Sequence, residues 1–127
     1  MKLLTLNTHS LHGGDWEQKL EWFVQGILEE KPDIIALQEV NQTITAQEAD
    51  DTLKEGQTVV SELVQVKQDN FAVQAAYRLR QLGVDCFWSW LPVKIGYDRY
   101  DEGTAILSIG RKIRKMAVFP ISQKWDY

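Results

Sequence analysis

Two short apolar runs near the N-terminus have the pattern of strands in a parallel sheet. Residues 34–37 are apolar without polar alternation and too few for a helix, which indicates a strand buried on both faces. Residues 2–6 form a second β-compatible run. Because parallel strands joined by a helix end at the same edge of a sheet, we expect the polar residues that follow, Asn7 and Glu39, to lie close together.

Helical spacing of apolar residues predicts two helices. In the first, the apolar positions are Trp16, Leu20, Phe23, Val24, Ile27 and Leu28. Asp15 is its expected N-cap, and Lys31 before a proline ends it. The second helix spans residues 72–82, with Asp69 or Asn70 able to cap it and Gly83 suited to its C-terminal end.

The remaining segments show weaker patterns. Residues 41–67 are mostly polar and predict a long, mobile loop near the site. Residues 84–91 alternate as a strand, which Pro92 either ends or places at a sheet edge. Two further strands, at residues 104–109 and 113–119, are separated by a tight turn and are expected to pair as an antiparallel hairpin.

Composition narrows the class of protein. The 127 residues suffice for one domain, and no apolar run approaches the roughly 20 residues of a membrane span. Cys86 is the only cysteine, which rules out an intrachain disulfide and suits a cytoplasmic location. The net charge of −4 argues against a non-specific nuclease, because proteins that bind duplexes usually show a basic face.

Glu39 is the residue on which a chemical hypothesis rests. A carboxylate at the C-terminal end of a strand lies where open α/β sheets bind ligands, and it suits a hard cation such as Mg²⁺. A glutamate that merely ends the strand in water is the alternative, and the residues of this strand do not separate the two.

Three segments, in this order, resemble the endonuclease/exonuclease/phosphatase superfamily. They are residues 2–9 (KLLTLNTH), 32–40 (PDIIALQEV) and 101–108 (DEGTAILS). The resemblance implies an α/β fold, the four-layer sandwich of two β-sheets flanked by helices. It also implies that Glu39 binds the metal, Mg²⁺ or Mn²⁺, and that Asn7 holds the site beside the metal or phosphate. Tyr97 or Tyr100 would match the phosphate-contacting tyrosine, and the role of His9 is open.

One departure from the family pattern is large. The family carries an Asp-x-Asn motif that positions water and a late Ser-Asp-His motif, and this sequence has neither. We therefore expect residues 1–127 to be a single partial domain, the N-terminal half of such an enzyme, and inactive alone. An inner sheet face including Leu4, Ile35, Trp88 or their neighbours would then lack its partner sheet, and the chain would self-associate or be poorly soluble.

The function expected from the resemblance is metal-dependent phosphoester hydrolysis. Residues 95–103 further resemble a bacterial branch that includes maltose-6'-phosphate phosphatases, so a small phosphorylated sugar is the expected substrate. Lys94 and Arg99 would contact phosphate and Tyr97 and Tyr100 the sugar, against the alternatives of solvated loop charges and hairpin packing. A phosphodiesterase acting on nucleic acid or a sphingolipid headgroup, and a non-catalytic interaction module, are the competing functions.

Overall fold

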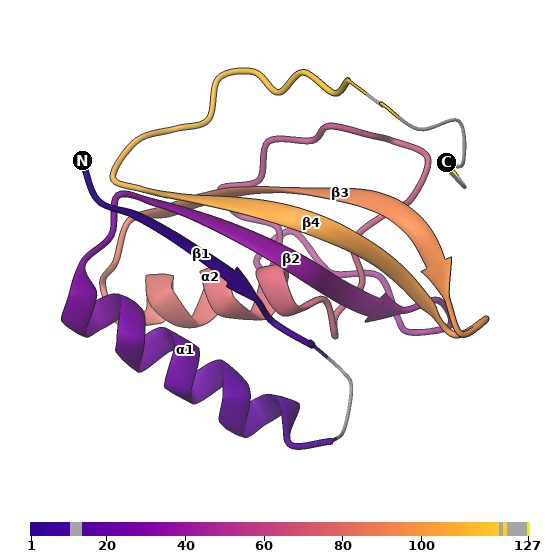
Figure 1. Ribbon diagram of the computed structural model, residues 1–127, viewed down its shortest axis with the longest axis horizontal. Coiled ribbons are helices and arrows are strands. Elements are labelled where there is room, and N and C mark those ends of the chain that lie inside the picture. The colour runs from indigo at the N-terminus through magenta and orange to yellow at the C-terminus, as the bar shows by residue number, and fades with distance from the viewer. Residues whose placement is uncertain (11–13, 120, 122–126) are drawn as a thin grey trace.

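The structure is a computed structural model that describes residues 1–10, 14–119, 121 and 127. Its elements follow the order β1 (Leu3–Asn7), α1 (Trp16–Glu30), β2 (Ile34–Thr43), α2 (Phe71–Gln81), β3 (Cys86–Gly96) and β4 (Tyr100–Ile109). The four strands form one mixed sheet in the order β1-β2-β4-β3 (Figure 1). β1 and β2 are parallel, and the other two neighbouring pairs are antiparallel. The predicted parallel unit of β1, α1 and β2 is therefore confirmed.

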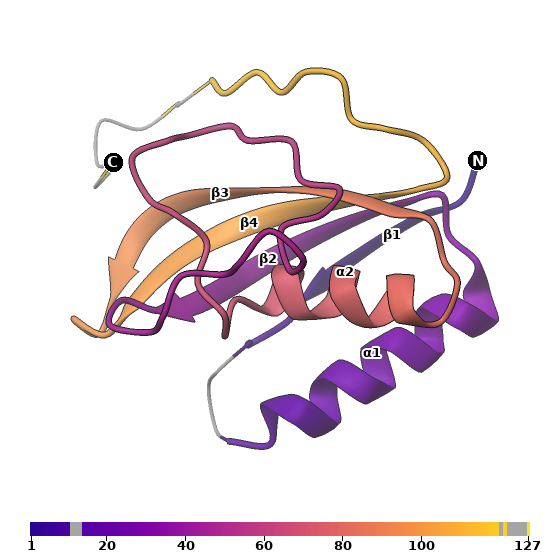
Figure 2. The same ribbon diagram turned by 180° about the vertical axis from the view of Figure 1, so that it is seen from behind.

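Both helices lie on the same side of the sheet, as the two opposite views show (Figures 1 and 2). α2 is the helix next to the strands, and its residues Phe71, Ala72, Val73, Ala75, Ala76 and Leu79 are fully buried. α1 packs beside it, with the rings of Phe23 and Phe71 5.7 Å apart in an edge-on contact. Arg78 of α2 also donates to Glu21 of α1 at 3.0 Å. The helices and the sheet thus enclose one core.

The caps of the two helices differ. The side chain of Asn70 accepts from the backbone N–H groups of Ala72 and Val73, and Gly83 follows α2 with φ +85°, as the sequence indicates. Asp15 makes no side-chain cap to α1. The predicted N-cap position is confirmed, but the capping bond is absent: Asp15 has φ 56°, whereas a capping residue usually has an extended backbone.

The expectation about the uncovered sheet face is wrong for the residues named. Ile35 and Trp88 are fully buried and Leu4 is partly buried against the same core, because these side chains point toward the helices. The opposite face of the sheet carries Ser89, Leu91, Thr104 and Ile106. This face and residues 116–119, which run above it in Figure 1, line a cavity of about 270 Å³.

Two further strand predictions have different outcomes. Of the two alternatives for Pro92, the edge position is confirmed: β3 continues past Pro92 to Gly96 and is an edge strand of the described sheet, where a proline is tolerated. Residues 113–119 are not a strand, and β4 forms its hairpin with β3 instead. The physical reason is that β4 already has β2 on one side and β3 on the other, so it offers no free edge to a following segment.

The segment between β2 and α2 begins and ends three residues later than the predicted loop, since β2 extends to Thr43 and α2 begins at Phe71. Its far end is held by the buried side chain of Gln42. This amide donates to the Gln65 carbonyl at 2.9 Å and accepts from the Lys67 N–H at 2.8 Å and from the Asn70 amide at 2.9 Å. The mobility expected of this segment stays a prediction.

Candidate functional site

Glu39 lies at an irregularity near the middle of β2. The antiparallel pairing with β4 is regular up to Leu37 opposite Ala105 and resumes with Val40 opposite Gly103. Gln38 and Glu39 therefore face the single residue Thr104, which is a β-bulge. Glu39 has φ 54°, a left-handed conformation that residues other than glycine rarely adopt and that costs about 1–3 kcal/mol. Bulges of this kind re-aim a side chain, here a carboxylate.

The end of β1 lies beside this bulge because Asn7 pairs with Gln38 in the parallel ladder. Nδ1 of His9 is 2.9 Å from Oε2 of Glu39, and both side chains reach solvent. The Asn7 side-chain oxygen accepts from the backbone N–H of His9 at 3.1 Å. Asn7 therefore orients the residue that contacts Glu39, and its own amide is a further oxygen donor at the same edge of the sheet.

Thr8 and Ser10 hold the bulge from the β1 side, and no sequence pattern singles out either residue. The Thr8 hydroxyl donates to the Glu39 carbonyl at 2.8 Å, and its N–H donates to the Gln38 carbonyl at 3.0 Å. The buried Ser10 hydroxyl accepts from the Asn41 N–H at 3.1 Å. Short polar residues after a strand are too common to single out, so only the fold reveals what these two do.

The β3–β4 hairpin forms the other wall of the site. A second bulge, at Val93, separates Pro92 opposite Gly103 from Lys94 opposite Glu102. Nζ of Lys94 is 3.1 Å from Oε2 of Glu102. This hydrogen bond and the charge of Glu102 raise the pKa of Lys94, and the charge of Glu39 acts in the same direction. Glu102, which the sequence analysis did not single out, therefore holds a charged ammonium at the site.

These two walls enclose an open hollow of about 590 Å³. It is lined by His9, Glu39, Lys94, Ile95, Gly96, Tyr97 and Glu102. Four of the predicted site residues thus come together there, namely His9, Glu39, Lys94 and Tyr97. Three do not line the hollow: Asn7 supports it from behind, and Arg99 and Tyr100 lie beyond it in the hairpin. The Arg99 guanidinium is stacked 5.3 Å from the centre of the Tyr100 ring.

The donors present fit a weakly held Mg²⁺ or Mn²⁺. In the part of the chain that the structure describes, no three His, Cys, Asp or Glu side chains gather as a metal cluster. Mg²⁺, however, is usually bound by one or two carboxylates and keeps several waters. Asn41, two residues after Glu39, is fully buried, and neither end of its side-chain amide has a partner among the described residues. Such an orphaned amide is unusual and fits a site that is completed by water or an ion.

No helix in the described part of the chain has the length and apolar character needed to cross a membrane.

The lone cysteine plays no part in the site. Cys86 is buried in the core, and burial raises the pKa of its thiol to about 12.

The four-stranded mixed sheet with both helices on one side defines an α/β fold (Figure 1). No protein-family model matches the chain, and no curated protein matches it. A solved structure does: an endonuclease/exonuclease/phosphatase family protein from Leptotrichia buccalis C-1013-b, with 27% sequence identity and a TM-score of 0.68 over 85% of this chain. The chain spans about a third of that protein, 36% of its length. The fold is therefore part of the endonuclease/exonuclease/phosphatase-like fold, and the similarity supports that superfamily.

Proposed function

We propose that the chain carries the metal-binding part of a phosphoester hydrolase site, with Glu39 as the main ligand of Mg²⁺ or Mn²⁺. The observation that carries the proposal is the placement of Glu39. Its carboxylate is turned by the bulge to the mouth of a hollow, with His9 at 2.9 Å and Lys94 on the opposite wall. The amides of Asn7 and Asn41 would add neutral oxygen donors, as Mg²⁺ sites with few carboxylates use.

Several residues of the chain would contribute to binding a phosphate group, each through a different interaction. A divalent cation held at Glu39 would neutralise negative charge on phosphoryl oxygens. Lys94 would attract the same group from the hairpin side, and its raised pKa keeps it charged at neutral pH. Glu102 would fix the direction of that ammonium through the 3.1 Å contact. Tyr97, exposed at the rim, would pack against the non-phosphate part of the substrate.

A small phosphorylated sugar is the substrate class that we favour. The hollow presents Lys94 as its one lysine or arginine among the described lining residues, whereas duplex binding rests on several phosphate contacts. The net charge of −4 and the resemblance of residues 95–103 to maltose-6'-phosphate phosphatases favour the same class. A phosphodiesterase is the competing activity of the same fold.

We also propose that this chain by itself turns over little or no substrate. Its sequence holds neither the Asp-x-Asn nor the Ser-Asp-His motif that the resemblance leads one to expect. Acid–base and electrostatic groups each contribute rate factors of about 100 or more, so a site without several of them is slow.

A metal titration tests the proposal. Mn²⁺ is added to the 127-residue chain, and the paramagnetic broadening of its backbone amide NMR signals is followed in wild type, Glu39→Gln and Glu30→Gln. Glu30 is a matched control because it is also an exposed glutamate beside a cation, Lys2 at 2.6 Å, outside the hollow. We expect broadening centred on Glu39. The Mn²⁺ affinity should fall about tenfold or more in Glu39→Gln and should be unchanged in Glu30→Gln. Equal affinity in all three proteins would refute the metal assignment.

The same NMR signals, recorded on samples without Mn²⁺, distinguish the substrate classes. With Mg²⁺ present, glucose 6-phosphate should shift the signals of Lys94 and Tyr97, and a 12-base-pair DNA duplex should leave them in place. Duplex binding without any response to the sugar phosphate would favour the phosphodiesterase.

A further inference from the structure

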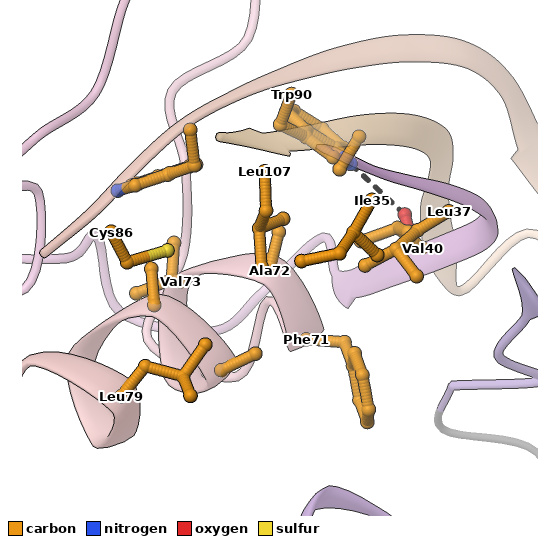
Figure 3. Packing of buried hydrophobic residues seen from close by; sticks show 14 of the residues in the cluster. Ile35, Leu37, Val40, Phe71, Ala72, Val73, Leu79, Cys86, Trp90 and Leu107 are labelled. Carbon is orange, nitrogen blue, oxygen red and sulfur yellow. Dashed lines mark hydrogen bonds between the residues drawn. The ribbon is translucent and has the colours of Figure 1, made fainter. Parts of the chain in front are cut away.

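The bulge that aims Glu39 is held on its core side by a contact outside the sheet ladder. The buried indole of Trp90, on β3, donates its Nε1–H to the carbonyl of Val40, on β2, at 3.0 Å (Figure 3). β4 lies between these two strands, so the indole reaches across a whole strand. Val40 is the first residue after Glu39 and the residue at which the regular pairing with β4 resumes.

The Trp90 indole can extend across β4 because position 103 of that strand is a glycine. Gly103 pairs with Val40 on one side and with Pro92 on the other. A Cβ at Gly103 would lie 2.3 Å from the Leu91 carbonyl oxygen and 2.7 Å from Nε1 of Trp90, which is closer than atoms can approach. Any other residue at position 103 would therefore displace the indole or the strand.

Two successive carbonyls at the bulge are thus fixed from opposite sides. Thr8 of the β1 end donates to the Glu39 carbonyl at 2.8 Å, and Trp90 donates to the Val40 carbonyl at 3.0 Å. Each bond limits the rotation of one peptide plane, and the two planes follow the residue that has φ 54°. An L residue keeps this conformation only where its surroundings over-determine it.

We infer that Trp90, with Gly103 as the opening it needs, is a positioning residue that holds Glu39 in its ligand geometry. The inference rests on the proposed function, since it assigns Trp90 a role through Glu39 as the metal ligand. Partners that orient a ligand from outside the first coordination sphere typically affect metal affinity by about 10- to 100-fold when they are removed.

The neighbouring Trp88 offers a matched control for a purely structural role. It lies two residues away on the same strand, is fully buried, and also donates its indole N–H to a carbonyl at 3.0 Å. Its acceptor is Glu55, in the segment before α2, which is not part of the Glu39 hollow. Replacing either tryptophan by phenylalanine removes one buried indole and one hydrogen bond, but only one of them touches the bulge.

The experiment compares wild type, Trp90→Phe, Trp88→Phe, Glu39→Gln and the Trp90→Phe/Glu39→Gln double variant in the Mn²⁺ titration by NMR. We expect Trp90→Phe to weaken Mn²⁺ binding about tenfold and Trp88→Phe to change it less than about twofold. The amide signals of Glu39 and Val40 should move in Trp90→Phe, without metal, and stay in Trp88→Phe. In the double variant, Trp90→Phe should cause no loss of Mn²⁺ affinity beyond the loss that Glu39→Gln causes alone.

Several outcomes overturn the inference. Equal weakening in the two tryptophan variants would mean a general structural effect, and unmoved Glu39 signals in Trp90→Phe would remove the positioning role. If Glu39→Gln binds Mn²⁺ like wild type, the proposed function fails, and the metal-free amide signals alone decide whether Trp90 fixes the bulge. If Trp90→Phe does not fold, β-(3-benzothienyl)alanine at position 90 keeps the two-ring shape and removes only the N–H donor.

Discussion

The first and second parts of β2 belong to one strand but are stabilised in different ways. Residues 34–37 pair regularly with β1 and β4, and Ile35 and Leu37 point into the core. Residues 38–43 contain the bulge, at Gln38 and Glu39, and the residues that follow it. Side chains satisfy much of their backbone: Thr8 and Trp90 donate to carbonyls, while Ser10 and Asp69 accept from the N–H groups of Asn41 and Thr43. The comparison teaches that the site arises where the ladder is interrupted, because only there can a strand residue turn its carboxylate out of the regular pattern.

The largest effect should come from the regular, core-facing side of the sheet. Leu107 of β4 is fully buried opposite Ile35, whereas Leu3 of β1 is 67% exposed. Leu107→Ala should lower the free energy of unfolding by about 2–5 kcal/mol through lost burial and a cavity. Leu3→Ala should change it by less than about 0.5 kcal/mol. Urea denaturation followed by circular dichroism measures both, and similar losses would show that the two faces are not distinct.

A smaller effect of opposite sign should come from the bulge. Glu39→Gly relieves the left-handed backbone at φ 54° and should raise the free energy of unfolding by about 1 kcal/mol while it abolishes Mn²⁺ binding. Gln38 is the control, since it has no positive φ, and Gln38→Gly should destabilise by about 0.5–1 kcal/mol. The same denaturation curves test this pair. If Glu39→Gly lowers the free energy of unfolding, the left-handed backbone of Glu39 does not destabilise the folded chain.

The smallest effect is the pH response of the core. Burial raises the pKa of the Cys86 thiol from 9.0 to about 12, so the unfolded chain loses this proton at lower pH than the folded chain does. The contribution of Cys86 to stability is therefore complete below pH 9 and is lost as the pH rises from 9 to 12. Between pH 8 and 9.5, wild type should lose less than about 1 kcal/mol relative to Cys86→Ala.

Thiol labelling provides an independent check of the same group. Iodoacetamide at pH 8 should leave Cys86 of the folded chain unmodified and should label it in urea, because burial keeps the thiol neutral and covered. Rapid labelling without denaturant would show that the core opens at β3.

Several elements were predictable because their signals are local. The helices follow from the spacing of apolar residues such as Phe23 and Leu79, and Asn70 and Gly83 mark the ends of α2 through their own backbone preferences. The strand at residues 34–37 follows from its apolar run. Pro92 left two alternatives, and the edge position is confirmed because β3 has only β4 as a strand neighbour in the sheet.

The wrong predictions concern which strand pairs with which. The pattern of residues 113–119 suits a strand, but a strand needs a free edge, and β4 has none. Leu4, Ile35 and Trp88 are apolar strand residues whichever face they occupy, so the sequence could not say that they face the helices. Asp15 lies at the predicted N-cap position but makes no capping bond, because the backbone there is left-handed.

By itself, the sequence determined the two helices, the parallel β1–α1–β2 unit and the closeness of Glu39 to Asn7, since periodicity and strand polarity suffice for these. The predicted strand end at Glu39 is wrong, because β2 continues past the bulge to Thr43. Only the tertiary structure decided the surroundings of Glu39. The bulge, the Thr8 and Trp90 bonds across strands, the opening at Gly103 and the Glu102–Lys94 pair join residues that lie up to 65 positions apart in the chain, as Glu39 and Thr104 do. Such contacts depend on register, and register is set by how all four strands pack together rather than by any one of them.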